Sequence, residues 1–190
     1  MNDPFEILEL PHGLAISSEK IDEAYRDASR RLHPDSGGEE DDFQEMAEAA
    51  ELLKSPSRRL RWAIESTESV WDSRGNVPRS VMDLFLPVAE AIQKIDQFEL
   101  ERGNAKSALG RAVLDARVPE LKRELEDVLQ RVSDEEAGLL EAFEDFDRRG
   151  WLEVAEQMGE VARGLSFLEK WQREIRAATG KLFQALLGGL

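Results

Sequence analysis

The amino-acid sequence predicts an all-α protein, with an N-terminal four-helix domain followed by an antiparallel three-helix bundle. Apolar residues recur at steps of three and four through nearly all of the 190 residues, and no segment carries a clear strand pattern. A stretch rich in Ser, Gly and Asn separates shorter helical segments from longer ones. We therefore expect a domain over residues 1–66, a linker over 67–79 and a bundle over 80–190.

The N-terminal domain starts with a helix signal at Asp3-Pro4, because aspartate is a favoured N-cap and proline suits the first helical position. A second helix follows a serine cap and ends near His33, because the residue before a proline is pushed out of the α region. The third and fourth helices are expected over residues 41–54 and 58–65. Phe43 lies on the apolar face of the third helix, and Pro56 ends that helix.

Three longer segments are expected to form the helices of the bundle, over residues 81–102, 119–149 and 151–187. Pro87 would start or kink the first of these helices. Gly150 follows two arginines and marks the end of the second helix. The residues from 105 to 116 are helical in composition, either as a separate short helix or as a bent continuation.

The formal net charge of −15 and the pI of about 4.6 disfavour nucleic acid and anionic membranes as partners. The chain has no cysteine, which excludes disulfides, thiolate nucleophiles and cysteine-ligated metals. We recognise no signal peptide and no apolar run of the roughly 20 residues that a spanning helix needs. The expected location is therefore the cytoplasm.

The tripeptide His33-Pro34-Asp35 directly follows the second predicted helix. Proline stiffens such a loop, a carboxylate can pair with an arginine of a partner, and histidine can donate or accept a hydrogen bond. The alternative interpretation is a simple helix end followed by a turn. The helix before the tripeptide carries a group of aromatic and basic residues that would steer docking: Tyr25, Arg26, Arg30 and Arg31.

The tripeptide and its flanking helices resemble the J-domain, the module that docks on DnaK-type chaperone ATPases and triggers ATP hydrolysis. Three segments carry the resemblance, which covers roughly residues 3 to 65: Ala24-Tyr25-Arg26, Phe43 through Leu53, and Leu53 through Arg59. The resemblance implies a protein that acts on another protein's chemistry and is not itself an enzyme, with no cofactor and no metal. Ser36 and Asp27 depart from the family, which usually has basic residues at these positions.

The combination of an N-terminal J-domain with an acidic helical bundle resembles the HscB-type iron–sulfur co-chaperones. Val81-Met82-Asp83 and the segment from Trp151 through Lys170 carry this second resemblance. It implies that the bundle holds the iron–sulfur scaffold protein through an apolar patch, with ordinary bundle core as the alternative. The positions that match the patch are Val81, Met82, Phe85 and Phe167, and the run Leu86-Pro87-Val88-Ala89 departs from the family pattern.

Three hypotheses therefore stand. The first is a co-chaperone that stimulates a DnaK/HscA-type ATPase and delivers the iron–sulfur scaffold protein. The second is a J-domain adaptor for a different client, motivated by Ser36 and Pro87. The third is a helical interaction protein that does not stimulate the chaperone.

Overall fold

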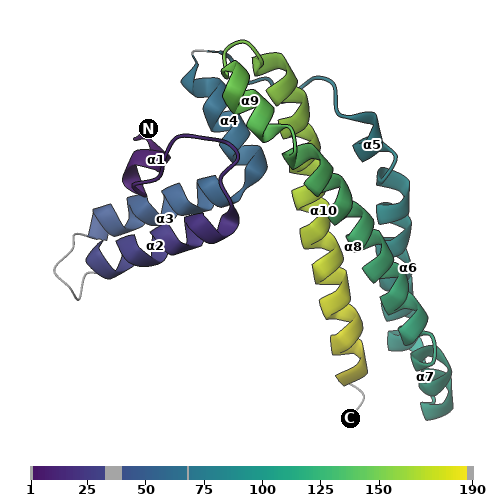
Figure 1. Ribbon diagram of the computed structural model, residues 1–190. Coiled ribbons are helices and arrows are strands. Elements are labelled where there is room, and N and C mark those ends of the chain that lie inside the picture. Colours follow the sequence, from purple (N-terminus) through teal and green to yellow (C-terminus); the bar gives the residue numbers. More distant parts are fainter. Residues whose placement is uncertain (1, 33–39, 68, 188–190) are drawn as a thin grey trace. The chain divides into compact units, whose positions relative to one another are not determined.

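The computed structural model describes residues 2–32, 40–67 and 69–187, and every regular element within these ranges is a helix (Figure 1). The predicted all-α class is confirmed. In chain order the helices are α1 Pro4–Ile7, α2 Ser18–Leu32, α3 Glu40–Lys54, α4 Pro56–Ser66, α5 Arg79–Met82, α6 Phe85–Asn104, α7 Ala108–Asp115, α8 Val118–Leu140, α9 Phe143–Arg149 and α10 Ala155–Leu187.

The helices pack into two compact units that do not follow the order of the chain. Unit 1 combines Met1–Asn76 with Leu139–Ser166, and unit 2 combines Val77–Gly138 with Phe167–Leu190. The boundaries at residues 66 and 80 remain a prediction about domains. Among the described residues, no helix is both long enough and apolar enough to cross a membrane.

Helix α1 begins as the sequence predicts. The Asp3 side chain accepts hydrogen bonds from the backbone amides of Phe5 at 2.9 Å and Glu6 at 3.4 Å, and Pro4 occupies the first turn. These bonds satisfy two of the amides that have no partner inside a helix. The cap directs the Phe5 side chain into the core of unit 1, where it is fully buried.

Helices α2 and α3 pack against each other, and α1 and α4 both pack against α3. The core between them is made of apolar side chains at helical spacing, among them Phe5, Ile21, Ala28, Met46, Ala50 and Leu53. Phe43 is only partly buried and packs against the edge of this core. Pro56 does not simply end α3, since it is the first residue of α4, with Ser55 as its N-cap.

Two of the predicted long helices are each broken into two. The segment 119–149 forms α8 and α9, because α9 turns to bury Phe143 and Phe146. Gly150 ends α9 with φ of 90°, as its position predicts. The segment 81–102 forms α5 and α6, and Pro87 lies in the first turn of α6, where its missing N–H costs no helical hydrogen bond.

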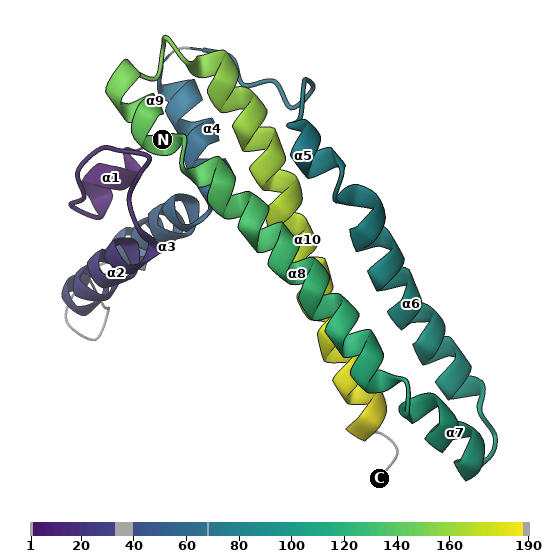
Figure 2. The ribbon, with the colours of Figure 1, turned by 45° about the vertical axis from the view of Figure 1, so that its right-hand side comes forward.

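Unit 2 contains α6 together with most of α8 and α10, which run side by side in both views (Figures 1 and 2). A polar contact links each pair of these helices. Lys94 of α6 lies 2.6 Å from Glu124 of α8, Lys181 of α10 lies 2.9 Å from Asp96 of α6, and Gln172 of α10 donates a hydrogen bond to Glu136 of α8 at 2.5 Å. The buried interior is apolar and includes Ile95, Phe98, Leu125, Val132, Leu168 and Ile175. Three long helices therefore surround one core, with α7 as a separate short helix.

Candidate docking surfaces

The predicted trigger residues His33, Pro34 and Asp35 lie outside the described residues, as does Ser36. The structure describes the helix on each side of them. Helix α2 ends at Leu32 and α3 begins at Glu40, and the two helices pack against each other. The tripeptide is therefore connected at both ends to one packed pair of helices.

The docking residues predicted on α2 differ in their exposure. Tyr25 is half-buried against the core, and the Lys54 ammonium of α3 lies 5.2 Å from the centre of its ring. Arg26, Arg30 and Arg31 are exposed. Tyr25 therefore supports the packing of α2 on α3, while the three arginines remain on the surface.

The positive patch predicted on α2 is partly neutralised by nearby carboxylates. The guanidinium of Arg30 lies 3.3 Å from the Asp27 carboxylate, and that of Arg31 lies 2.7 Å from Glu9. Helix α2 carries four acidic side chains (Glu19, Asp22, Glu23, Asp27) against four basic ones (Lys20, Arg26, Arg30, Arg31), so its formal charge is zero. Exposed pairs of this kind are worth only about 0.2–1 kcal/mol. A partner with a strongly acidic face can therefore compete for these arginines.

The loop before α2 is held by a side chain from far along the chain. Asp147 of α9 accepts hydrogen bonds from the backbone amides of Leu14, at 2.8 and 2.9 Å, and of Ala15, at 3.1 Å. Gly13 comes so close that a Cβ there would lie 3.3 Å from the Asp147 carboxylate. This contact fixes the chain that leads into α2, and nothing near Asp147 in the sequence predicts it.

Aromatic side chains pack next to the contact between Asp147 and the loop before α2. The Trp151 indole donates a hydrogen bond to Asp147 at 2.9 Å, and its ring centre lies 6.2 Å from that of Trp62 in α4. Trp62 in turn packs against Phe5 with ring centres 5.4 Å apart. The sequence placed Trp151 at the start of the last helix, whereas the structure places it in the turn before α10.

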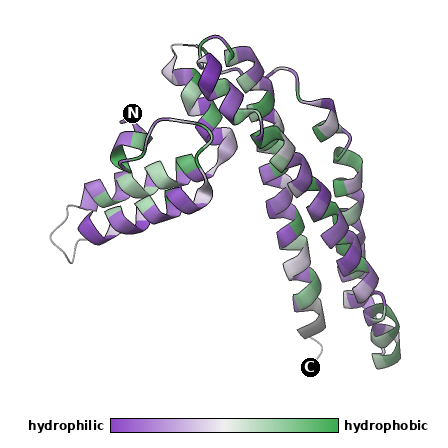
Figure 3. Cartoon of the chain, in the orientation of Figure 1, coloured by the Kyte–Doolittle hydropathy of each residue, from purple (hydrophilic) through white to green (hydrophobic). Residues whose placement is uncertain are grey.

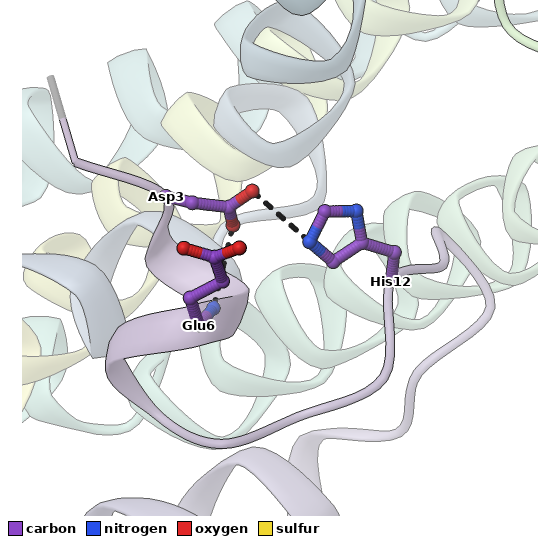
Figure 4. A group of neighbouring side chains, drawn as sticks. All are labelled: Asp3, Glu6 and His12. Atoms are coloured by element: carbon purple, nitrogen blue, oxygen red, sulfur yellow. Dashed lines mark hydrogen bonds and ion pairs between the residues drawn. The ribbon is translucent and has the colours of Figure 1, made fainter.

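Asp3, Glu6 and His12 are close enough together to be considered as metal ligands, with one possible ligand atom of each within 4.8 Å of the others (Figure 4). Their arrangement has a simpler explanation. Asp3 caps α1 and lies 3.0 Å from the His12 imidazole, which packs against the Phe5 ring. We therefore assign the cluster to the stability of the first helix.

The residues predicted to bind a scaffold protein fall into two groups. Val81 is fully buried, so its predicted place in a contact surface is corrected to the core of unit 2. Met82, Phe85 and Phe167 are 49 %, 55 % and 38 % exposed. The rings of Phe85 and Phe167 both lie against Trp171, at 6.3 and 5.7 Å between centres.

Leu86 is a further exposed apolar residue that the patch prediction did not include. It follows Phe85 directly in α6 and is 61 % exposed. The signal for it in the sequence is the run Leu86-Pro87-Val88-Ala89, which departs from the family pattern. We call the exposed residues Met82, Phe85, Leu86 and Phe167 the aromatic patch.

Comparison with known proteins defines the class of the N-terminal part. Residues 3–62 match the family model of the DnaJ domain, a range that includes His33 to Asp35 and helices α1 to α3. The chain therefore contains a J-domain. It is 40 % identical over 55 residues to "Chaperone protein dnaJ 3" of Arabidopsis thaliana and 40 % identical over 60 residues to "Chaperone protein DnaJ 1" of Cutibacterium acnes. These matches cover 29 % and 30 % of this chain but only 13 % and 15 % of those proteins.

A third relative is similar beyond the J-domain. The chain is 25 % identical over 117 residues to "Co-chaperone protein HscB homolog" of Haemophilus ducreyi, covering 57 % of this chain and 68 % of that protein. An alignment of 117 residues is longer than the segment 3–62, so it reaches into the bundle. The resemblance to HscB-type co-chaperones inferred from the sequence thus has independent support.

Proposed function

We propose that this protein is a co-chaperone that stimulates the ATPase of a DnaK/HscA-type chaperone through His33-Pro34-Asp35 and has no catalytic activity of its own. The observation that carries the proposal is the DnaJ-domain match over residues 3–62, which spans the tripeptide and both flanking helices. The chemistry of ATP hydrolysis belongs to the partner, and this chain supplies a docking surface.

In the proposed mechanism, α2 guides the encounter with the chaperone, and the tripeptide triggers ATP hydrolysis by the chaperone. The exposed arginines of α2 attract an acidic face of the chaperone and speed up the encounter. Asp35 then pairs with a basic group of the partner, which is a strong charge-assisted contact when an arginine binds it bidentately. Pro34 restricts the backbone, so little conformational entropy is lost on docking.

The proposal is tested by single-turnover ATP hydrolysis with two matched substitutions of aspartate by asparagine. Asp35→Asn should abolish stimulation, because it removes the carboxylate from the trigger. Asp27→Asn should instead lower the half-saturating concentration about 2–5-fold, because it frees Arg30 from the only ion pair that the structure gives it among the described residues. Equal stimulation by the wild type and Asp35→Asn would refute the proposed trigger.

We further propose that the aromatic patch binds an iron–sulfur scaffold protein, with the cluster as the cargo of that scaffold. Two observations support this step. The similarity to the HscB homolog reaches beyond the J-domain. Three of the four residues implied by the resemblance are exposed, and the rings of Phe85 and Phe167 both pack against that of Trp171. Aromatic side chains in such clusters dominate binding energy at interfaces.

Binding to the scaffold protein can be measured directly by calorimetry with paired variants. Phe85→Ser with Phe167→Ser should weaken binding at least 10-fold, since central aromatic residues of an interface often contribute more than about 1.4 kcal/mol. The matched control is Leu152→Ser, because Leu152 is 70 % exposed but belongs to unit 1. An unchanged affinity in the double phenylalanine variant would exclude the aromatic patch.

The second candidate function is that of a J-domain adaptor for a different client. It is favoured by the exposed Leu86 and by Pro87 in the first turn of α6, both at positions that depart from the HscB pattern. Co-purification of another protein in place of the scaffold, dependent on Phe85 and Phe167, would decide for it. The helical interaction protein without stimulation stays the third alternative, and the cytoplasmic location stays a prediction.

A further inference from the structure

Helix α7 has no role in the proposed function, yet it is held firmly in unit 2. The Arg102 guanidinium lies 2.6 Å from the Asp115 carboxylate, and Arg117 lies 2.6 Å from Glu101. Ser107 caps the helix by accepting a hydrogen bond from the Gly110 amide at 3.0 Å. Both ends of α7 are therefore fixed by polar contacts, and α7 packs on α6.

None of the eight residues of α7 is buried. A helix this short is marginal by itself, and helices in proteins usually gain their stability by burying an apolar face. Leu109 and Val113 are four residues apart, so they share one face, and they are 76 % and 63 % exposed. Leu100 of α6, the helix on which α7 packs, is a further exposed apolar side chain, at 60 %.

The hydropathy colouring shows much of the α7 ribbon in green, the colour of apolar residues (Figure 3). Exposed single apolar residues are ordinary on a protein surface. A short helix with no buried residue, and with two of its three large apolar side chains (Leu109 and Val113, but not the half-buried Leu114) exposed, is not. This pattern indicates a surface that is completed by another molecule.

The charge around α7 is opposite in sign to that of the whole chain. Residues 103–117 contain Lys106, Arg111 and Arg117 against Asp115 alone, a local charge of +2 on a chain of −15. Lys106 and Arg111 form no ion pair within the described part of the chain, and Arg111 donates to the Ala105 carbonyl at 3.1 Å. Their charges remain available to a partner.

We propose that α7, with Leu100, is a docking site for an acidic amphipathic segment of a partner protein, an apolar stripe flanked by Asp or Glu. Leu109 and Val113 would bury against the stripe, and Lys106 and Arg111 would pair with its carboxylates. This site goes beyond the proposed function, because it uses neither the trigger tripeptide nor the aromatic patch.

Two other occupants fit the observations less well. In a symmetric dimer through this face, Lys106 and Arg111 would approach their own copies, and three apolar side chains are few for the roughly 800 Å² that each partner of a stable complex buries. An anionic membrane would be repelled by the acidic remainder of the chain. Opposite charge therefore favours an acidic protein segment.

The test uses the 190-residue chain and two synthetic helical peptides of about 14 residues with the same leucine stripe, one flanked by Glu and the other by Lys. In ¹H–¹⁵N NMR titrations, the Glu-flanked peptide should shift the amides of residues 108–115 and leave those around Phe85 unchanged. The Lys-flanked peptide should bind at least 10-fold more weakly, because its charges repel Lys106 and Arg111.

Three variants separate the contributions to this binding. Leu109→Ser with Val113→Ser should remove binding, and Lys106→Glu with Arg111→Glu should weaken it at least 10-fold while leaving the apolar face intact. Leu152→Ser, in unit 1, is the matched control and should change nothing. The charge variant keeps the test valid if the serine variant unfolds α7.

Several outcomes would overturn the proposal. One is no shift of the α7 amides at millimolar peptide, and another is equal binding of both peptides. A third is self-association in sedimentation runs that is lost in Leu109→Ser, which would assign the face to a second copy of this chain. None of these outcomes depends on chaperone stimulation, so this site and the proposed function can fail separately.

Discussion

At the scale of single residues, Asp147 joins two segments that are far apart in the sequence. Its carboxylate accepts hydrogen bonds from the amides of Leu14 and Ala15 and from the Trp151 indole. A carboxylate that loses such donors leaves amide groups without partners, and each partly buried one costs free energy. Asp147 is thus important for the entrance to α2, the helix of the proposed docking surface.

We predict that Asp147→Ala lowers the free energy of unfolding by about 2 kcal/mol, because two backbone amides and an indole lose a charged acceptor. The measurement is urea unfolding followed by tryptophan fluorescence. The control is Asp145→Ala on the same helix, which removes only exposed ion pairs to Arg148 and Arg149 and should cost less than about 1 kcal/mol. Equal losses in the two variants would show that the contact with the α2 loop contributes nothing.

The structural role of a residue could be predicted from the sequence where it depends on neighbouring residues, and not where it depends on distant ones. The cap at Asp3 and the end signal at Gly150 depend on neighbours in the sequence, and both are found where they were expected. The contact of Asp147 with the loop before α2 could not be predicted, because its backbone donors Leu14 and Ala15 lie 133 and 132 residues away. Val81 was misplaced because an apolar residue in an interface and one in a core have the same pattern in the sequence.

At the scale of elements, the helical periodicity predicted which segments are helices better than where they break. The segment 119–149 keeps its steps of three and four through the gap between α8 and α9, so its pattern gives no sign of the break. The break follows from packing, since α9 belongs to unit 1 while most of α8 belongs to unit 2. A one-dimensional pattern carries no information about such a division.

Phe5 and Phe43 offer a comparison of core and edge positions in the J-domain. Phe5 is fully buried, whereas Phe43 is only partly buried against the same core. We predict that Phe5→Ala costs about 3–5 kcal/mol of unfolding free energy and Phe43→Ala about 1–2 kcal/mol, since less apolar area is lost and a smaller cavity forms. Thermal and urea unfolding would measure both, and a larger loss for Phe43→Ala would contradict the described packing.

The contact between α2 and α3 should depend on pH. A hydrogen bond from Lys54, 2.5 Å away, lowers the pKa of the Asp22 carboxyl, and the charge of Lys54 adds to the effect. Because the folded pKa is lowered, this contact stabilises the protein above the ordinary carboxyl pKa of about 3.9 and is lost as the pH falls through the folded pKa.

We therefore predict that wild type is more stable than Asp22→Asn at pH 7 and that the difference shrinks as the pH falls below about 4. Urea unfolding at a series of pH values would measure it. Glu23→Gln on the same helix is the control, because the structure gives Glu23 no ion pair within the described residues. A difference that is independent of pH would show that the Asp22 charge does not stabilise the fold.

At the scale of the whole molecule, two compact units are assembled from interleaved parts of the chain. Unit 1 contains the J-domain and also residues 139–166, which lie beyond the DnaJ match over residues 3–62. The motif and the all-α class were evident in the sequence, because they depend on local residues. The partition into units was not, because it depends on contacts across more than a hundred residues.

The function proposed for this chain couples a chaperone trigger to a client-binding patch. It is tested most directly by single-turnover ATP hydrolysis on the host's DnaK/HscA-type chaperone, with and without the iron–sulfur scaffold protein. We predict stimulation that requires Asp35, and a further increase with scaffold that requires Phe85 and Phe167. Stimulation that is indifferent to scaffold would contradict the proposed client, and no stimulation at any concentration would contradict the co-chaperone function itself.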